Sequence, residues 1–238
     1  MTAADQDFAA LDGEALVAAL RQRYDAVEVA LACGGRGWRL LRPGSPEALI
    51  DEEAFDRDGR IPYWAEVWPS GQVLADRIAG EGAPPRGAGL LELGSGVGLL
   101  SLAAIAAGYP PAQVVASDYH AEALDFVRAN AWLNGVPAPR TAALDWRALP
   151  PTLPRFARVV AADVLYEPAH AGLVAAALAR SLAAGGVGLV ADPGRRTAAT
   201  FAERCADAGL AAERERVPLE QGALTLTIEV FMLRHAGT

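Results

Sequence analysis

"LLELGSGVGLLSLAA", residues 90–104, places Gly94, Gly96 and Gly98 at alternate positions between two apolar runs. Glycine loses more backbone entropy on folding than any other residue, so three glycines in this setting need a structural reason. A buried strand that turns sharply into a helix supplies one, because the turn brings backbone N–H groups at a helix start within reach of a polar ligand. The stretch therefore predicts a strand, a tight turn and a helix from Leu99, and a tight turn without a ligand would explain the same spacing.

Segments typical of strands and helices alternate on both sides of this turn. Strands are expected near residues 88–93, 113–117, 139–144, 157–162 and 187–191, and helices near 69–80, 97–107, 120–133, 169–183 and 195–208. Such alternation is typical of a parallel sheet with helices on both faces. The last two strands, 211–219 and 224–233, follow each other without a helix, so the final strand should enter the sheet antiparallel. The sequence predicts an α/β fold with a doubly wound, mostly parallel seven-stranded sheet.

The first sixty residues read as a small α+β extension. Apolar spacing predicts a helix over 12–24, and the glycine-rich turn at 34–37 predicts a β-hairpin. Residues 43–62 are rich in Pro, Asp, Glu and Gly and are expected to form a loop with a frayed helical stretch. We therefore divide the chain into an N-terminal extension, 1–60, and a main domain, 61–238.

Composition limits the classes of function. The 238 residues are 52% hydrophobic and carry a net charge of −8. This negative charge disfavours binding to the phosphates of nucleic acid. No apolar run is long enough to span a bilayer, and the acidic start lacks the order of a signal peptide. Cys33, Cys205 and three scattered histidines give no metal-ligand spacing. We expect a cytoplasmic monomer or weak dimer without a metal, a nucleic-acid partner or a membrane partner.

Acidic residues and a tryptophan suggest a ligand for the glycine turn. Glu92 lies two residues before the first glycine, where a carboxylate suits an ammonium or sulfonium group better than the pyrophosphate of a GxGxxG site. Asp118 ends the next strand, where it would bind ribose hydroxyls or act as N-cap of the following helix. Asp145 and Trp146 follow the third strand, where they would bind adenine, although a partly buried tryptophan under a loop explains the ring as well.

These motifs resemble a known family. "LLELGSGVG" at 90–98, "VVASDYH" at 114–120 and "LDWRAL" at 144–149 resemble the class I, seven-strand S-adenosylmethionine-dependent methyltransferases with their Rossmann-like fold. "IPYWAEVWPSGQVLADRIA" at 61–79 and "VVAADVLYEP" at 159–168 resemble the protein-lysine methyltransferase branch. Within that branch the pattern is similar to the electron-transfer flavoprotein β-subunit lysine methyltransferases.

The resemblance implies S-adenosylmethionine as cofactor and gives roles by position. The implied cofactor-binding residues are Trp68, Glu92, Gly94, Ser95, Gly96, Asp118, Trp146 and Ala162. Asp163 and Tyr166, of an Asp-x-x-Tyr motif, would face the methyl group and orient the incoming amine, whereas a helix cap and a packed loop aromatic are their structural alternatives. Tyr63 and Trp64 would either wall the substrate slot or attach the extension to the sheet. "ADPGR" at 191–195 ends the fifth strand and also resembles the family, although a turn before a helix explains its Pro193 and Gly194.

The implied activity is methylation of lysine side chains in a protein substrate, with the β subunit of electron-transfer flavoprotein as the example that the resemblance offers. Two alternatives stay open: a methyltransferase for a small amine or a nicotinamide-like heterocycle, and an inactive cofactor-binding interaction module. An open, acidic rim beside the methyl group would favour a protein acceptor, and a closed lid would favour a small molecule. The intact motifs argue against the inactive module.

Overall fold

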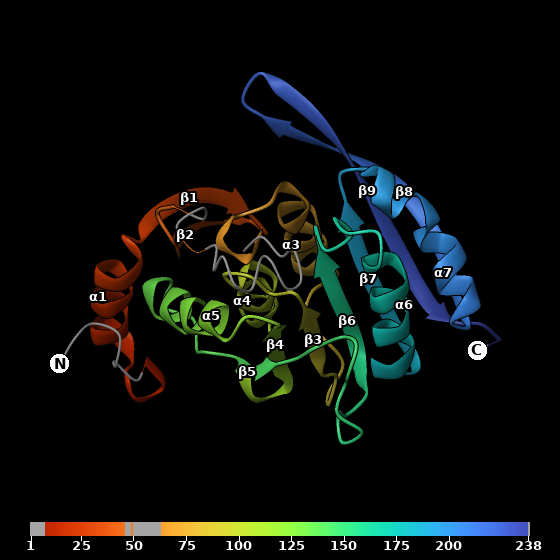
Figure 1. Cartoon of the computed structure of the whole chain (residues 1–238), viewed down its shortest axis with the longest axis horizontal. Coiled ribbons are helices and arrows are strands. Elements are labelled where there is room, and N and C mark those ends of the chain that lie inside the picture. Colours follow the sequence, from red (N-terminus) through yellow and green to blue (C-terminus); the bar gives the residue numbers. More distant parts are fainter. Residues whose placement is uncertain (1–7, 46–48, 50–62, 238) are drawn as a thin grey trace.

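The computed structural model describes residues 8–45, 49 and 63–237, and its centre is a seven-stranded sheet (Figure 1). The strand order is β5-β4-β3-β6-β7-β9-β8, in which β9 runs antiparallel to both its neighbours and the other pairs are parallel. The strands are β3 (Leu90–Leu93), β4 (Val114–Asp118), β5 (Arg140–Ala143), β6 (Phe156–Ala162), β7 (Leu182–Asp192), β8 (Leu210–Gln221) and β9 (Leu224–His235). The predicted doubly wound sheet with an antiparallel last strand is confirmed.

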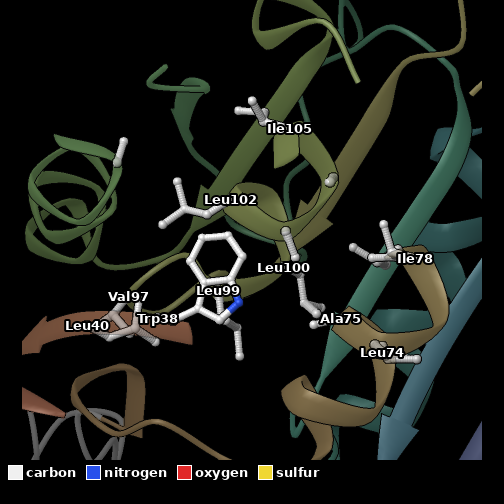
Figure 2. Close-up of a cluster of buried hydrophobic side chains, with 14 of the residues drawn as sticks. Trp38, Leu40, Leu74, Ala75, Ile78, Val97, Leu99, Leu100, Leu102 and Ile105 are labelled. Atoms are coloured by element: carbon white, nitrogen blue, oxygen red, sulfur yellow. The ribbon is translucent and has the colours of Figure 1, made fainter. Parts of the chain in front are cut away.

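Helices cover both faces of the sheet, as a buried parallel sheet requires. They are α3 (Pro69–Glu81), α4 (Leu99–Ala106), α5 (Ala121–Leu133), α6 (His170–Ser181) and α7 (Phe201–Asp207). Apolar residues of α3, α4 and α5 belong to one buried cluster, and those of α6 and α7 belong to a second cluster on the opposite face. Figure 2 shows the first cluster where α3 meets α4, with Leu74 and Ile78 on α3 and Leu100 on α4. None of the described helices is long and apolar enough to cross a bilayer.

The N-terminal extension shares the hydrophobic core of the main domain. It consists of α1 (Gly13–Tyr24) and the hairpin of β1 (Val27–Cys33) and β2 (Arg36–Arg42). Trp38 of β2 is buried in the cluster of Figure 2. The amide of Asn130, on α5, accepts the N–H of Leu41 at 2.6 Å and donates to the same residue's carbonyl at 3.0 Å. The extension is therefore joined to α5 by both apolar contacts and hydrogen bonds.

Some expectations about boundaries need correction. The helix expected over 169–183 ends at Ser181, and the strand expected at 187–191 already begins at Leu182. The helix expected from residue 195 begins as a 3₁₀ helix over Arg196–Thr200 and becomes α-helical at Phe201, and Arg195 itself is extended with its N–H bound to Asp192. The domain boundary after residue 60 and most of the loop expected over 43–62 lie outside the described residues.

Candidate functional site

A cavity of about 300 Å³ opens at the carboxyl ends of β3, β4 and β6. The chain order reverses at β3, with β4 on one side and β6 on the other, and ligands of doubly wound proteins bind at such a switch point. The structure brings every predicted cofactor and catalytic residue to this cavity: Trp68, Glu92, Gly94, Ser95, Gly96, Asp118, Trp146, Ala162, Asp163 and Tyr166. Residues from five separate segments of the sequence therefore form one site.

The glycine turn is required by the protein's own packing as well as by its sharp bend. Gly94 and Gly96 have positive φ angles of 69° and 49°, which side-chain-bearing residues rarely adopt. A Cβ on Gly94 would lie 2.9 Å from a methyl carbon of Val164, and a Cβ on Gly96 would lie 3.0 Å from the carbonyl oxygen of Trp64. The close neighbours of this backbone thus include protein atoms, which the sequence alone did not indicate.

Asp118 joins the glycine turn to His120, the residue before α5. Its carboxylate accepts the N–H of Gly96 at 2.9 Å and the N–H of His120 at 3.0 Å. The N-cap position of α5 is occupied by His120, so the alternative role of Asp118 as that N-cap is wrong. Burial raises the pKa of Asp118, and the backbone N–H groups counteract this.

Glu92 faces the start of α4. Its buried carboxylate accepts hydrogen bonds from the backbone N–H of Ser101, at 2.9 Å, and from the hydroxyl of the same residue. Burial raises the pKa of Glu92 to about 7, although the bonds from Ser101 act in the opposite direction. Near neutral pH this group therefore exchanges between a neutral acid and a carboxylate at the wall of the cavity.

Two buried polar atoms at the cavity have no partner within the described part of the chain. They are the indole nitrogen of Trp146 and the hydroxyl of Ser95. Buried polar groups are nearly always hydrogen-bonded, so two unpaired ones in a cavity of this size fit a polar, nucleoside-like ligand. Asp145, expected to accept from adenine, also lines the cavity and binds the guanidinium of Arg147, with its nearest oxygen 2.6 Å away.

Asp163 lines the same cavity directly after the end of β6 and is almost fully buried. It follows β6 with a positive φ of 59°, a conformation rare outside glycine. One oxygen accepts the N–H of Ser70, in the first turn of α3, at 2.9 Å, and the other accepts from Arg195 at 2.8 Å. Asp163 therefore caps a helix that precedes it in sequence, while the N-cap position of the next helix, α6, is Ala169.

An aromatic wall continues from Asp163 along the cavity. The ring of Tyr166 lies 4.5 Å from that of Tyr63 and 4.6 Å from that of His170, between ring centroids. Trp68 donates its indole N–H to the carbonyl of Tyr63 at 2.9 Å. Trp64 also reaches the cavity but is buried with its ring 5.6 Å from that of Phe126. Of the neighbouring pair, Tyr63 joins the aromatic wall and the ring of Trp64 packs into the core.

Sequence reasoning missed several residues of the site. His120, His170, Glu66 and Glu167 also line the cavity. The histidines were assessed only as metal ligands, and in the described residues no cluster of His, Cys, Asp and Glu could hold a metal ion. Arg195, which pairs with Asp163, lies in the stretch that was attributed to a turn.

Comparison with known proteins identifies the same family as the sequence motifs do. A family model described as lysine methyltransferase matches residues 56–203. The electron transfer flavoprotein beta subunit lysine methyltransferase of Xenopus laevis is 32% identical over 138 residues, which make up 56% of this chain and 53% of that protein. The chain spans about half the length of the curated relatives it matches.

Solved structures share the fold. The ribosomal protein L11 methylase of Lactobacillus delbrueckii subsp. bulgaricus gives a TM-score of 0.54 at 19% identity, over 70% of this chain and 78% of that one. The magnesium protoporphyrin IX methyltransferase of Synechocystis PCC 6803, solved with bound S-adenosylmethionine, gives 0.53 at 19% identity, over 76% and 91% of the two chains. At such identities the likeness shows the architecture and not the acceptor.

Proposed function

The chain belongs to the lysine methyltransferase family, and from this premise we propose that it transfers a methyl group from S-adenosylmethionine to lysine side chains of a protein. The observation that carries the proposal is the cavity at the switch point, which is lined by residues from the five segments whose motifs resemble the family. The unpaired indole N–H of Trp146 suits the adenine of this cofactor, and the unpaired hydroxyl of Ser95 suits its polar methionine part. When bound, S-adenosylmethionine supplies a methyl group activated by a sulfonium centre.

The cofactor would occupy the end of the cavity formed by β3 and β4. Glu92, Gly94, Ser95 and Gly96 would hold its methionine part. The remaining contacts would come from Asp118 at the ribose, Trp146 at the adenine, Trp68 near the glycine turn and Ala162 through its backbone. This assignment rests on motif position together with the shared cavity.

Asp163 and Tyr166 would orient the acceptor amine at the other end. A lysine amine attacks only when neutral, although its ordinary pKa is about 10.4. The aromatic wall that includes Tyr63 and Tyr166 would exclude water from the amine and lower its pKa. The buried carboxylate of Asp163 keeps lone pairs beyond those used by Ser70 and Arg195, and these would accept a hydrogen bond from the amine.

The charge of the cavity favours a basic acceptor. Glu66 and Glu167 line it with side chains that are 37% and 35% exposed, and they lie 3.2 Å from Arg42 and from His170 respectively. Carboxylates at an opening attract the ammonium groups of lysine-rich segments and speed their encounter. The relatives named for the β subunit of electron-transfer flavoprotein make that protein the first substrate to test.

The test is incorporation of a labelled methyl group. The purified protein is incubated with labelled S-adenosylmethionine and either the β subunit of electron-transfer flavoprotein or a lysate, and labelled peptides are mapped by mass spectrometry. We expect methylated lysine, and we expect none with the Asp163→Asn variant under the same conditions. Label found only on a small molecule would support the alternative acceptor class, and cofactor binding without any transfer would support an inactive binding module.

A further inference from the structure

The guanidinium of Arg195 joins two buried carboxylates that end neighbouring strands. β6 and β7 pair in parallel, so Asp163 and Asp192 emerge side by side at the same edge of the sheet. One nitrogen of Arg195, Nη1, donates to both carboxylates at 2.8 Å. Asp192 also accepts the backbone N–H of Arg195 at 2.7 Å, so the arginine is fixed at its backbone and at its side chain.

The burial of these groups makes the arginine necessary. The side chains of Asp163 and Asp192 are 1% and 0% exposed, whereas that of Arg195 is 23% exposed. Burying a charge without a partner is strongly unfavourable, so the carboxylates depend on their hydrogen-bond donors. For Asp163 those donors are Arg195 and the N–H of Ser70, whose place in the first turn of α3 adds the favourable field of a helix N-terminus.

Arg195 also contacts the aromatic wall. Its guanidinium carbon lies 5.5 Å from the ring centroid of Trp68, within the range of a cation–π interaction. Trp68 in turn donates to the carbonyl of Tyr63, whose ring packs on Tyr166. Arg195 itself is absent from the described lining of the cavity, so any effect on the reaction must pass through these neighbours.

We propose that Arg195 is a positioning residue of the methyl-transfer site, which holds the carboxyl group of Asp163 against the start of α3 and fixes the ring of Trp68. The role in turnover rests on the proposed function. The link between Arg195 and Asp163 is a property of the folded chain and can be tested without any substrate.

Removal of the arginine should change how Asp163 responds to pH. Burial raises the pKa of this carboxyl and Arg195 lowers it, so Arg195→Ala should raise it further. Asp192 faces the same guanidinium. Other titratable or charged groups also line the cavity, namely Tyr63, Glu66, Glu92, Asp118, Tyr119, His120, Asp145, Arg147, Tyr166, Glu167 and His170. Because Asp192 loses the same partner, the contribution of Asp163 must be isolated with a double variant.

The first experiment measures thermal unfolding without substrate or cofactor. A buried acid with a raised pKa makes the folded state less stable as the pH rises above the ordinary aspartate range. The loss of Tm in Arg195→Ala, relative to wild type, should therefore be larger at about pH 8 than at about pH 5. Adding Asp163→Asn to Arg195→Ala should make this loss less dependent on pH. An equal loss of Tm at both pH values in the single variant would overturn the proposal.

The second experiment measures turnover and cofactor affinity in the same variants. Arg195→Ala should bind S-adenosylmethionine nearly as wild type does, with turnover lowered by about tenfold to a hundredfold, as expected when a reacting group is misplaced. Its activity should recover partly at higher pH, where Asp163 loses its proton. Arg195→Lys keeps the charge and should restore part of the turnover, whereas Arg195→Gln should behave as the alanine variant.

The neighbouring Arg196, which is exposed, provides the matched control, and Arg196→Ala should match wild type throughout. Wild-type turnover in Arg195→Ala, or equal defects in the lysine and glutamine variants, would overturn the positioning role. If the wild-type protein methylates no protein at all, the proposed function fails. The comparison of Tm values then still decides whether Arg195 holds Asp163.

Discussion

The two ends of the cavity are built from different kinds of contact. At the glycine-turn end, formed by β3, β4 and the turn at residues 94–98, the carboxylates of Glu92 and Asp118 bind N–H groups 9 and 22 residues away in the sequence. At the Asp163 end, the same kind of group is held by Ser70, 93 residues away, and by Arg195, 32 residues away. The contacts of the Asp163 end join residues farther apart in the sequence than those of the glycine-turn end, so the Asp163 end depends on a larger part of the fold.

The largest expected effect tests the Asp163 end. Asp163→Asn should lower turnover by on the order of a hundredfold or more, while the Kd for S-adenosylmethionine stays within about threefold of wild type. The reason is that the charge facing the amine is lost while the glycine turn is untouched. Single-turnover kinetics with the identified acceptor and calorimetry with the cofactor measure the two quantities.

Asparagine also turns one acceptor of Asp163 into a donor, opposite either Arg195 or the N–H of Ser70. Thermal unfolding is therefore the control, and a folded variant is required before the rates are compared. Wild-type turnover in a folded Asp163→Asn protein would leave Asp163 as a cap of α3 alone.

The next effect tests the glycine-turn end. Asp118→Ala should weaken S-adenosylmethionine and S-adenosylhomocysteine alike, by roughly tenfold to a hundredfold, because both carry the same ribose and a charge-assisted hydrogen bond is worth about 1.5–3 kcal/mol. Calorimetry with both ligands checks this, and Asp207→Ala, at an exposed carboxylate, is the control. Selective loss of one ligand would argue against contact with the ribose.

A smaller effect concerns the charge of Glu92. Because the pKa of Glu92 is about 7 in the folded chain, its carboxyl is mostly protonated at pH 6 and mostly ionised at pH 8. Affinity for the cationic S-adenosylmethionine should therefore rise roughly tenfold over that interval, and Glu92→Gln should abolish the rise. A Kd that does not vary with pH in the wild-type protein would remove Glu92 from the cofactor's surroundings.

The raised pKa of Glu92 also affects the stability of the folded chain. The folded pKa of Glu92 lies above its value in an unfolded chain, so ionisation favours the unfolded state. The free energy of unfolding without ligand should fall as the pH rises from the ordinary glutamate range to about 7, and the fall should be smaller in Glu92→Gln. Denaturant unfolding at several pH values measures it, and equal slopes for both proteins would contradict the burial argument.

The smallest effect separates the ring of Tyr166 from its hydroxyl. Tyr166→Phe keeps the contacts with Tyr63 and His170, so turnover should fall by less than about tenfold. Tyr166→Ala removes those contacts and should cost more. A loss in the phenylalanine variant as large as that in Asp163→Asn would instead assign the hydroxyl a direct role in holding the amine.

Much of the fold and of the glycine-turn end could be predicted because the signals are local. Alternating apolar strands and helices fix a parallel sheet, and the carboxyl ends of its strands meet at one edge. Glu92 lies near the carboxyl end of β3, Asp118 ends β4 and Trp146 follows β5, so all three reach one cavity. The direction of the Glu92 carboxylate, toward Ser101 on α4, could not be foreseen, because a side chain's rotamer depends on packing.

For the Asp163 end, the sequence predicted the residue itself but not its hydrogen-bond partners. The Asp-x-x-Tyr pattern marked Asp163, but nothing local ties it to Ser70 or to Arg195. Those contacts exist because β6 and β7 pair in parallel and α3 begins against their ends. The residues from Asp192 to Arg195 are explained by a simple turn, so their pattern did not predict the contact of Arg195 with Asp163.

The most direct test of the separation between the two ends is the single-turnover rate at saturating S-adenosylmethionine. Each variant is measured with the same acceptor while the cofactor concentration is raised far above its Kd. The account predicts that Asp118→Ala recovers nearly the wild-type rate, because its defect is in binding, and that Asp163→Asn stays slow at every concentration. Recovery of Asp163→Asn, or persistent slowness of Asp118→Ala, would contradict a site divided into a cofactor end and an acceptor end.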